Sequence, residues 1–332
     1  MIQSSLDSST SEPLVSVVIV AHDNWPDLEL AVESALCQSW KRLEVIVVDN
    51  DSADATPAEI ASRYGARVRY VRQANKLDGG GYNRGIAESN GDYVQLLDGD
   101  DFLAPNKIAR QLETFLEHPD ADIVYGDVRQ FQGQAGRPQW SDWDTRAHTD
   151  MLATLISPAG AGAGLVPHSA LFRRSALDRV GPWDESLVGA DMDFWLRASW
   201  AGCVFVYSPG SWCFHRRRPS QMSADASAMV NRTVTTLEKA LIYIDREPYR
   251  SMTRSRLAGL YYGSAMTDLR LDRWAALAAL RSARDLDPRK VSALPFAIGV
   301  TAASIPGARR VLKARPFRAI RRAVARSLGV LD

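Results

Sequence analysis

Residues 92–116 read DYVQLLDGDDFLAPNKIARQLETFL and place a short apolar run directly before a cluster of acids. We predict a buried strand over Asp92–Leu97 and a helix over Pro105–Leu116, because the apolar residues of the second part recur at helical spacing. Asp98 and Asp100 could offer carboxylate oxygens to a hard divalent cation such as Mg²⁺ or Mn²⁺. An acidic turn that caps the next helix would look much the same, since Asp and Gly are ordinary turn residues.

The same alternation of strand and helix extends on both sides of this stretch. Strands are expected over Leu14–Val20, Leu43–Val48, Val68–Val71 and Ile123–Val128, and helices over Pro26–Cys37, Thr56–Tyr64 and Gly81–Ser89. The alternation predicts an α/β fold, with a mostly parallel sheet and helices on both faces. Further along, Ser169–Arg179, Asp191–Ala201 and the chain from Ala226 onward show helical periodicity.

Polar residues follow the first four predicted strands at the points where these strands end. They are Asp23, Asp49, Asn75 and Asp98, in chain order. Ligands of open α/β sheets bind in the crevice beyond the carboxyl ends of the strands. We therefore expect these four side chains to converge on one crevice.

Two of these strand ends carry longer polar segments. Residues 47–56 read VVDNDSADAT, and an Asp there could accept from a base N–H or a ribose hydroxyl. The same segment could equally serve as a helix N-cap through Asp54. Residues 75–85 read NKLDGGGYNRG, where adjacent glycines would let the backbone approach a ligand closely. A flexible loop would explain these glycines nearly as well, and the segment matches neither a dinucleotide-binding nor a Walker A pattern.

A fourth acidic segment lies far downstream, in GADMDFWLR over residues 189–197. Asp191 stands at the mouth of a predicted helix whose other face is apolar, where it could act as a general base. As an isolated pattern, it fits a helix N-cap better than a base.

Taken in order, five segments of the chain resemble the family 2 glycosyltransferases. They are SVVIVAHDN (16–24), VVDNDSADAT (47–56), the long block from Asn75 to Asp101, LFRRSALDRVGPWDESLVGADMDFWLRASWAG (171–202) and HRRRPSQMS (215–223). The resemblance covers about residues 13–224, and both the order and the spacing of the blocks agree. It implies a GT-A nucleotide-sugar-binding domain over residues 13–225, after a disordered leader (1–12) and before a helical C-terminal region (226–332).

The resemblance also implies roles for individual residues. Asp98 and Asp100 would be the DxD pair that holds ribose and metal, and Asp191 would be the base that deprotonates the acceptor hydroxyl. The implied nucleotide-sugar-binding residues are Asp23, Asp49, Asp51, Asn75, Gly80, Asn83, Asp98, Arg216 and Arg218. His215 falls in the same closing segment, near the diphosphate. The chain departs from the family pattern where Leu77 replaces a Gly, Tyr82 an Arg, Ala190 a Glu and Arg218 a His.

The implied reaction is metal-dependent transfer of a sugar, with inversion, from a nucleotide-diphosphate sugar to an acceptor hydroxyl. Mg²⁺ or Mn²⁺ would neutralise the departing diphosphate, with Arg216 or Arg218 assisting. The expected acceptor is a glycan or lipid-linked glycan of a cell-surface polysaccharide. A binding module that holds nucleotide or glycan without turnover stays open, with Ala190 as its hint. A nucleotidyltransferase is disfavoured, because AHDNWPD (21–27) stands where a Gly- and Lys-rich phosphate loop is expected.

Charge along the chain is uneven although the net charge is only +1, which gives no sign of a nucleic-acid partner. Residues 288–331 contain no acid and ten bases, with apolar residues from Phe317 to Leu331 on a narrow helical stripe. Such a helix could rest on an anionic membrane surface, or dock on its own domain. The polar leader, the few cysteines and the lack of a long apolar run lead us to expect a cytoplasmic protein, peripheral on the inner face of the membrane if the tail binds lipid.

Overall fold

The computed structural model describes residues 12–132, 139–143, 145–157, 165–218, 225–268 and 273–289. The chain divides into two compact units. One unit comprises Met1–His148 and Gly164–Pro219, and the other Thr149–Ala163 and Ser220–Asp332. The predicted basic tail beyond Arg289, and all of the predicted leader except Glu12, lie outside the described residues.

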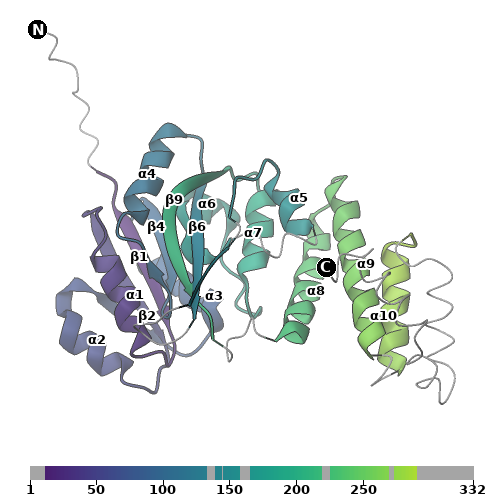
Figure 1. Cartoon of the computed structure of the whole chain (residues 1–332), viewed down its shortest axis with the longest axis horizontal. Helices are drawn as coiled ribbons and strands as arrows, with labels where there is room; N and C mark the ends of the chain where they lie inside the picture. Colours follow the sequence, from purple (N-terminus) through teal and green to yellow (C-terminus); the bar gives the residue numbers. More distant parts are fainter. Residues whose placement is uncertain are drawn as a thin grey trace, which may run out of the picture. The chain divides into compact units, whose positions relative to one another are not determined.

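The first unit is built on one mixed sheet flanked by helices (Figure 1). Its strand order is β3-β2-β1-β4-β8-β6-β9-β5, and β7 pairs with β6. The strands are β1 (Val15–Ala21), β2 (Leu43–Asn50), β3 (Arg69–Gln73), β4 (Tyr93–Asp98), β5 (Phe102–Leu103), β6 (Ile123–Gln132), β7 (Gln139–Asp142), β8 (Ala170–Arg173) and β9 (Phe205–Arg216). The first four strands are parallel, as predicted. Strands β8, β7 and β5 pair antiparallel with their neighbours, so the second half of the sheet is mixed.

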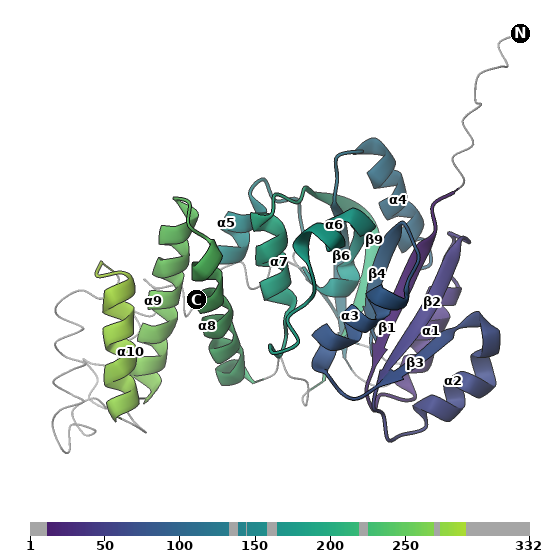
Figure 2. The same ribbon diagram turned by 180° about the vertical axis from the view of Figure 1, so that it is seen from behind.

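Strand β1 shows why the first half of the sheet is buried on both faces. Val15, Val17 and Ile19 belong to the main apolar core, together with residues of helices α1 (Asp27–Leu36) and α4 (Lys107–Glu117). The alternate residues Val18 and Val20 lie beside Gly85 and Gly81 of helix α3 (Leu77–Glu88). Figure 2 shows α3 on the other side of the sheet from α1. A continuous β-branched run is what a strand covered on both faces requires.

Most of the predicted elements are present, with ends shifted by a few residues. Helix α2 (Thr56–Tyr64) has the predicted bounds, and α7 (Asp191–Trp200) differs from its prediction by one residue. The helix predicted over Ser169–Arg179 is wrong in its first part. Ala170–Arg173 forms β8 between β4 and β6, and only Arg174–Val180 (α6) is helical. Pairing on both sides outweighs local propensity there.

The second unit is helical, as the periodicity beyond Ala226 predicted. Its helices are α5 (Met151–Ile156), α8 (Ala226–Tyr243), α9 (Tyr249–Asp268) and α10 (Arg273–Leu286). Three alanines of the α9–α10 contact, Ala258, Ala276 and Ala283, are fully buried, and small residues let two helices approach closely. Within the described parts of the chain, no helix combines the length and apolar character needed to cross a membrane.

Candidate active site

The acidic turn after β4 contains Gly99, which packs closely against the end of β1. Any larger residue at this position would force its neighbours to shift. The Gly99 N–H donates to the carbonyl of Val20 at 2.8 Å, which ties the turn to the end of β1. A Cβ on Gly99 would lie 2.9 Å from that carbonyl oxygen and 2.3 Å from Nδ2 of Asn24. Asp98 and Asp100, on either side of this glycine, each keep about a third of their side-chain surface exposed (32%). The sequence placed both acids correctly at the strand end.

Beneath this turn lies a buried cluster of Asp101, His168 and His215, whose potential ligand atoms all fall within 4.8 Å of one another. Oδ2 of Asp101 lies 3.2 Å from Nδ1 of His168 and 3.1 Å from Nδ1 of His215. Burial acts to raise the pKa of Asp101, but the two imidazoles outweigh it and hold this pKa below its usual range. Burial likewise acts to lower the pKa of His168, and Asp101 holds it well above its ordinary value. The cluster is therefore a buried ion pair that fixes the turn from below.

Two arginines from the end of β9 lie over the same turn. Nε of Arg216 donates to the Asp100 carbonyl at 3.0 Å, and Nη2 of Arg218 lies 3.7 Å from Oδ2 of Asp100. Antiparallel pairing of β9 with β5, which follows the acidic turn directly, brings these residues together across more than a hundred positions of sequence. The arrangement places fixed positive charge beside paired carboxylates, which suits an anionic ligand bridged by a metal.

The donor set at this turn fits a hard divalent cation. Burial raises the pKa of Asp100 to about 7, and the charges of Asp101 and Asp98 add to the rise. Crowded carboxylates of this kind are stabilised when a cation arrives, because each disfavours the ionised form of the others. Oxygen donors from Asp98 and Asp100 are the ligands that Mg²⁺ and Mn²⁺ prefer, whereas the Asp101, His168 and His215 set offers two nitrogens and suits softer metals better.

The ends of β1 and β2 form a second polar patch, on the predicted nucleoside side. Asp49 is fully buried, and its carboxylate accepts hydrogen bonds from the Ser52 N–H at 2.8 Å and from the Tyr70 hydroxyl. Asp51 is exposed, has a left-handed backbone (φ 66°) and pairs with Arg72 at 3.0 Å. Asp49 thus shapes the turn, and Asp51 presents the accessible carboxylate.

Asp23 joins the ends of β1 and β2. Its backbone is also left-handed (φ 47°), and its Oδ1 accepts from the Ala53 N–H at 2.6 Å. The Asp23 N–H in turn donates to Oγ of Ser52 at 3.1 Å. The predicted nucleoside contacts of Asp23, Asp49 and Asp51 stay predictions, and these residues do lie on adjoining turns.

The glycine-rich segment is not a loop, because its glycines lie in the first turns of α3. A Cβ on Gly81 would lie 2.5 Å from Val20, and one on Gly80 would lie 2.3 Å from Cβ of Lys76. These glycines therefore let the helix pack closely on itself and on β1, which the sequence could not distinguish from approach to a ligand. Asn75 accepts from the Leu77 N–H at 2.9 Å at the start of this helix.

Asn83 joins α3 to the segment that precedes Asp191. Its Oδ1 accepts from the Trp183 N–H at 2.8 Å, and its Nδ2 donates to the Trp183 carbonyl at 2.9 Å. The Tyr82 ring packs 5.0 Å from the Trp183 ring, and the Tyr82 hydroxyl donates to Asp98. Asn83 therefore positions a neighbouring segment, while its contact with a nucleotide sugar stays a prediction.

Asp191 begins helix α7 and does not cap it, since the N-cap position is Ala190 and no side chain caps the helix. Burial holds the pKa of Tyr82 well above its ordinary value, and Asp98, Asp78 and Asp191 all add to the rise. Asp98 and Asp191 therefore act electrostatically on the same phenol, from the strand side and from the helix side. Tyr82 links the predicted metal pair to the predicted base.

His168 and Asp101 have no predicted role, yet the structure brings both to the acidic turn. His168 interrupts an otherwise apolar run, LVPHSALF over residues 165–172. Its ring is fully buried, and its Nδ1 lies 3.2 Å from Oδ2 of Asp101 and 3.6 Å from Oδ2 of Asp98. A polar residue in a buried run was the available signal, because such residues are nearly always paired.

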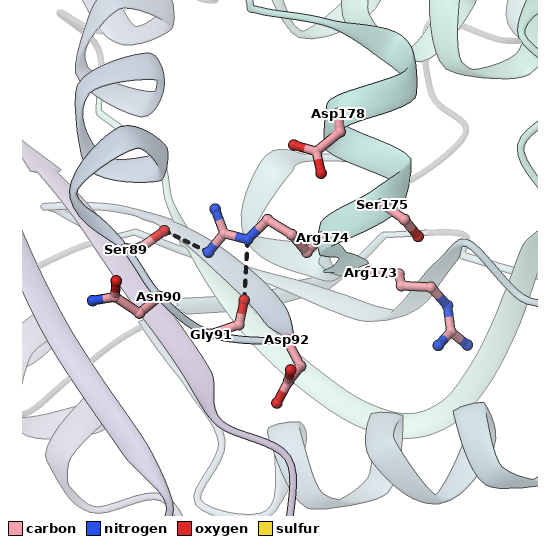
Figure 3. Close-up of a pocket in the computed structure, with 8 residues that line it drawn as sticks. All are labelled: Ser89, Asn90, Gly91, Asp92, Arg173, Arg174, Ser175 and Asp178. Atoms are coloured by element: carbon pink, nitrogen blue, oxygen red, sulfur yellow. Dashed lines mark hydrogen bonds between the residues drawn. The ribbon is translucent and has the colours of Figure 1, made fainter.

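A hollow of about 580 Å³ lies at the other end of β4, between the turn at 89–92 and the segment 173–178 (Figure 3). Arg174 occupies it as a clamp, with Nε donating to the Gly91 carbonyl at 3.0 Å and Nη2 to Oγ of Ser89 at 2.8 Å. These bonds hold the turn that leads from α3 into β4. The hollow lies at the amino end of the strand, so it is separate from the crevice of the predicted site.

Comparison with known sequences identifies the family. Residues 16–181, half of the chain, match the family described as glycosyl transferase family 2. The chain belongs to this family. An uncharacterised glycosyltransferase of Rickettsia typhi is 30% identical over 198 residues, which cover 58% of this chain and 60% of the relative. The succinoglycan biosynthesis protein ExoO of Rhizobium meliloti is 39% identical over 102 residues, or 30% of this chain and 29% of the relative.

This chain covers only part of its curated relatives: the first three are matched over 28% to 60% of their own length. Solved structures share its fold over nearly the whole chain. TarS residues 1–349 of S. aureus align with a TM-score of 0.62 at 17% identity, covering 93% of this chain and 91% of that TarS fragment. The mannosyltransferase PcManGT of Pyrobaculum calidifontis aligns with a TM-score of 0.58 at 17% identity, covering 97% of this chain and 86% of the other. The predicted GT-A fold with C-terminal helices is confirmed.

Proposed function

We propose that the protein is an inverting glycosyltransferase that moves a sugar from a nucleotide-diphosphate sugar to an acceptor hydroxyl. The observation that carries the proposal is the contact of Arg216 and Arg218 with Asp100, in the acidic turn that begins at Asp98, in a chain of family 2. Carboxylates suited to a metal, set beside fixed cations, are what a nucleotide diphosphate requires.

Mg²⁺ or Mn²⁺ would be held by Asp98 and Asp100, and would supply neutralisation of the diphosphate as it departs. Arg216 and Arg218 bind the same diphosphate from the side of β9. The exposed Asp51 and the turn of Asp23 lie where the base and ribose of the donor are expected. Each of these groups would either neutralise the charge that develops on the diphosphate or hold the donor in position, and both effects lower the barrier to transfer.

Asp191 is the proposed base. It takes the proton of the acceptor hydroxyl as that oxygen forms a bond to the anomeric carbon, while the bond from this carbon to the diphosphate oxygen breaks on the opposite face. A single base on the acceptor side accounts for inversion, by analogy with inverting glycosidases. The charge of Asp191 acts on Tyr82, and Tyr82 hydrogen-bonds Asp98, which supports a proposed base close to the proposed metal pair.

The donor and the acceptor are proposed from the relatives. One neighbouring structure is TarS with UDP-GlcNAc, and another is PcManGT with GDP-Man and Mn²⁺, so UDP- and GDP-sugars are the first donors to test. The likeness to a succinoglycan biosynthesis protein supports a polysaccharide or lipid-linked glycan as the acceptor. We place the enzyme on the cytoplasmic side, peripheral to the membrane, because the basic tail seen in the sequence suits an anionic surface.

The test is a panel of UDP-, dTDP- and GDP-sugars, read first by thermal shift with Mn²⁺ and then by release of the nucleotide diphosphate. We expect one donor class to stabilise the protein and to be hydrolysed slowly, with EDTA abolishing both effects. Stabilisation without any turnover would instead favour a non-catalytic binding module, for which Ala190 in place of the family Glu is the supporting observation. No stabilisation by any donor would overturn the proposal.

A further inference from the structure

Asp27, the first residue of α1, is joined to both arginines of the site. Its Oδ1 lies 3.1 Å from Nη2 of Arg216, and its Oδ2 accepts from Nη2 of Arg218. The same two guanidinium groups reach Asp100, through its carbonyl and its carboxylate. One carboxylate of the first helix therefore ties the end of β9 to the acidic turn after β4.

We propose that Asp27 is a positioning residue for donor binding, which holds Arg216 and Arg218 as a pair over the DxD turn. This inference rests on the proposed function. Two guanidinium groups held side by side repel each other, and a carboxylate shared between them offsets that repulsion. Asp27 is two-thirds buried and Arg216 is 14% exposed, so the attraction is screened less than at the open surface.

The geometry also gives Arg218 two acidic partners that compete for it. Arg218 lies between Asp27, which it contacts directly, and Asp100, which is 3.7 Å away. A guanidinium drawn fully onto Asp100 would occupy oxygen atoms that a metal needs, and it would leave the diphosphate without one of its cations. Asp27 keeps Arg218 off Asp100, so that the carboxylate stays available to the metal and the arginine stays available to the diphosphate.

The experiment measures binding of UDP and GDP to the full chain by calorimetry, at a series of Mn²⁺ concentrations. We expect Asp27→Asn to weaken nucleotide binding about 10-fold to 100-fold, the usual cost of losing a group that orients a ligand-binding side chain. The Mn²⁺ concentration for half-maximal binding should rise in the same variant. Asp27→Glu should restore most of both values, and turnover at saturating donor and metal should change much less than binding.

Glu29 is the matched control, because it lies in the same first helical turn and is ion-paired with Arg63 on the surface. Glu29→Gln removes the same charge from the same helix N-terminus and should leave binding unchanged. Equal behaviour of Asp27→Asn and Glu29→Gln would overturn the inference, since Asp27 would then act only on the helix. In the double variant Asp27→Asn, Arg218→Gln, the Mn²⁺ requirement should return toward the wild-type value while nucleotide binding stays weak.

Failure of the inference and failure of the proposed function are distinguishable. If the wild-type chain binds neither nucleotide and no donor of the panel stabilises it, the proposed function fails. The inference is then decided by titrating Mn²⁺ alone into wild type and Asp27→Asn. A weaker Mn²⁺ affinity in the variant supports the competition at Asp100, and identical affinities overturn it. If the wild type binds a nucleotide and Asp27→Asn binds it equally well, the function stands and the positioning role is wrong.

Discussion

The two halves of the sheet supply opposite kinds of chemistry to one place. The half made of β3, β2, β1 and β4 is parallel and ends in acids, among them Asp49 and Asp98. The half made of β8, β6, β9 and β5 contains antiparallel pairs, and β9 ends in the cationic Arg216. Under the proposed function, the acidic half would hold the metal and the arginines of the other half would hold the diphosphate. Donor binding would then depend on the pairing of β9 with β5, which brings the two together.

The largest loss of turnover is expected when Asp100, in the acidic half of the sheet, is replaced. Asp100→Ala removes a carboxylate that the metal needs, and metal assistance contributes several kcal/mol, so turnover should fall roughly 10³-fold or more. The measurement is donor turnover against Mn²⁺ concentration. Asp120→Ala is the control, because Asp120 is an exposed acid of the same unit, outside the acidic turn. Full activity of Asp100→Ala, or of the wild type in excess EDTA, would contradict the assignment.

The second prediction separates binding from chemistry, since in the proposed function both halves of the sheet would act on the donor and Asp191 on the acceptor. Asp191→Asn keeps the size of the side chain but cannot accept the acceptor proton. We expect kcat to fall by about 10² to 10⁴ with donor affinity unchanged. Affinity is read by thermal shift with nucleotide and Mn²⁺, and rate by single-turnover transfer. A matching loss of donor affinity would assign Asp191 to the donor site instead.

The third prediction concerns Lys107, which lies where the two halves meet. It is fully buried and donates to Gln95 of β4, while Cys213 of β9 acts on its charge. Burial lowers the pKa of Lys107 from 10.5 to about 7. Between these values the unfolded chain binds one more proton than the folded chain, so stability rises with pH by up to about 1.4 kcal/mol per pH unit, and is lost as pH falls toward 7.

Lys107→Met removes the titrating group, so the free energy of unfolding should depend less steeply on pH. This holds even if the substitution also changes stability at every pH by a constant amount. The measurement is the free energy of unfolding by denaturant from pH 7 to pH 10 in both proteins. Arg110→Met, on the same helix, is the control and should keep the wild-type slope, because an arginine does not titrate in this range. Parallel curves for wild type and Lys107→Met would show that Lys107 is charged in the folded protein.

The smallest effect is expected from the basic tail, which belongs to neither half of the sheet. Each Arg near an anionic bilayer contributes roughly 1 kcal/mol, and salt screens this attraction. The full chain should therefore float with anionic vesicles at low salt and be released at high salt, whereas a chain ending at Pro306 should not float. Equal partitioning of the two chains would assign the tail to a role away from lipid.

The sequence by itself determined the parallel half of the fold and its acids. A β-branched run such as Val15–Val20 can only be a strand covered on both faces, and a strand end fixes where the following Asp must lie. These are local relations, so the positions of Asp98 and Asp100 could be predicted from a few neighbouring residues.

The other half of the site was decided by tertiary structure alone. Strand β9 contains Pro209 and Gly210, with a register shift opposite Gly126, so no local pattern predicts it. His168 is paired with Asp101, and Asp27 with Arg218, only because distant strands and helices meet. The same holds for the glycines of α3, whose use in packing depends on Val20 of another element. Contacts between residues far apart in the chain produce no local sequence pattern. Such contacts bring Arg218 to Asp27 and Asp100.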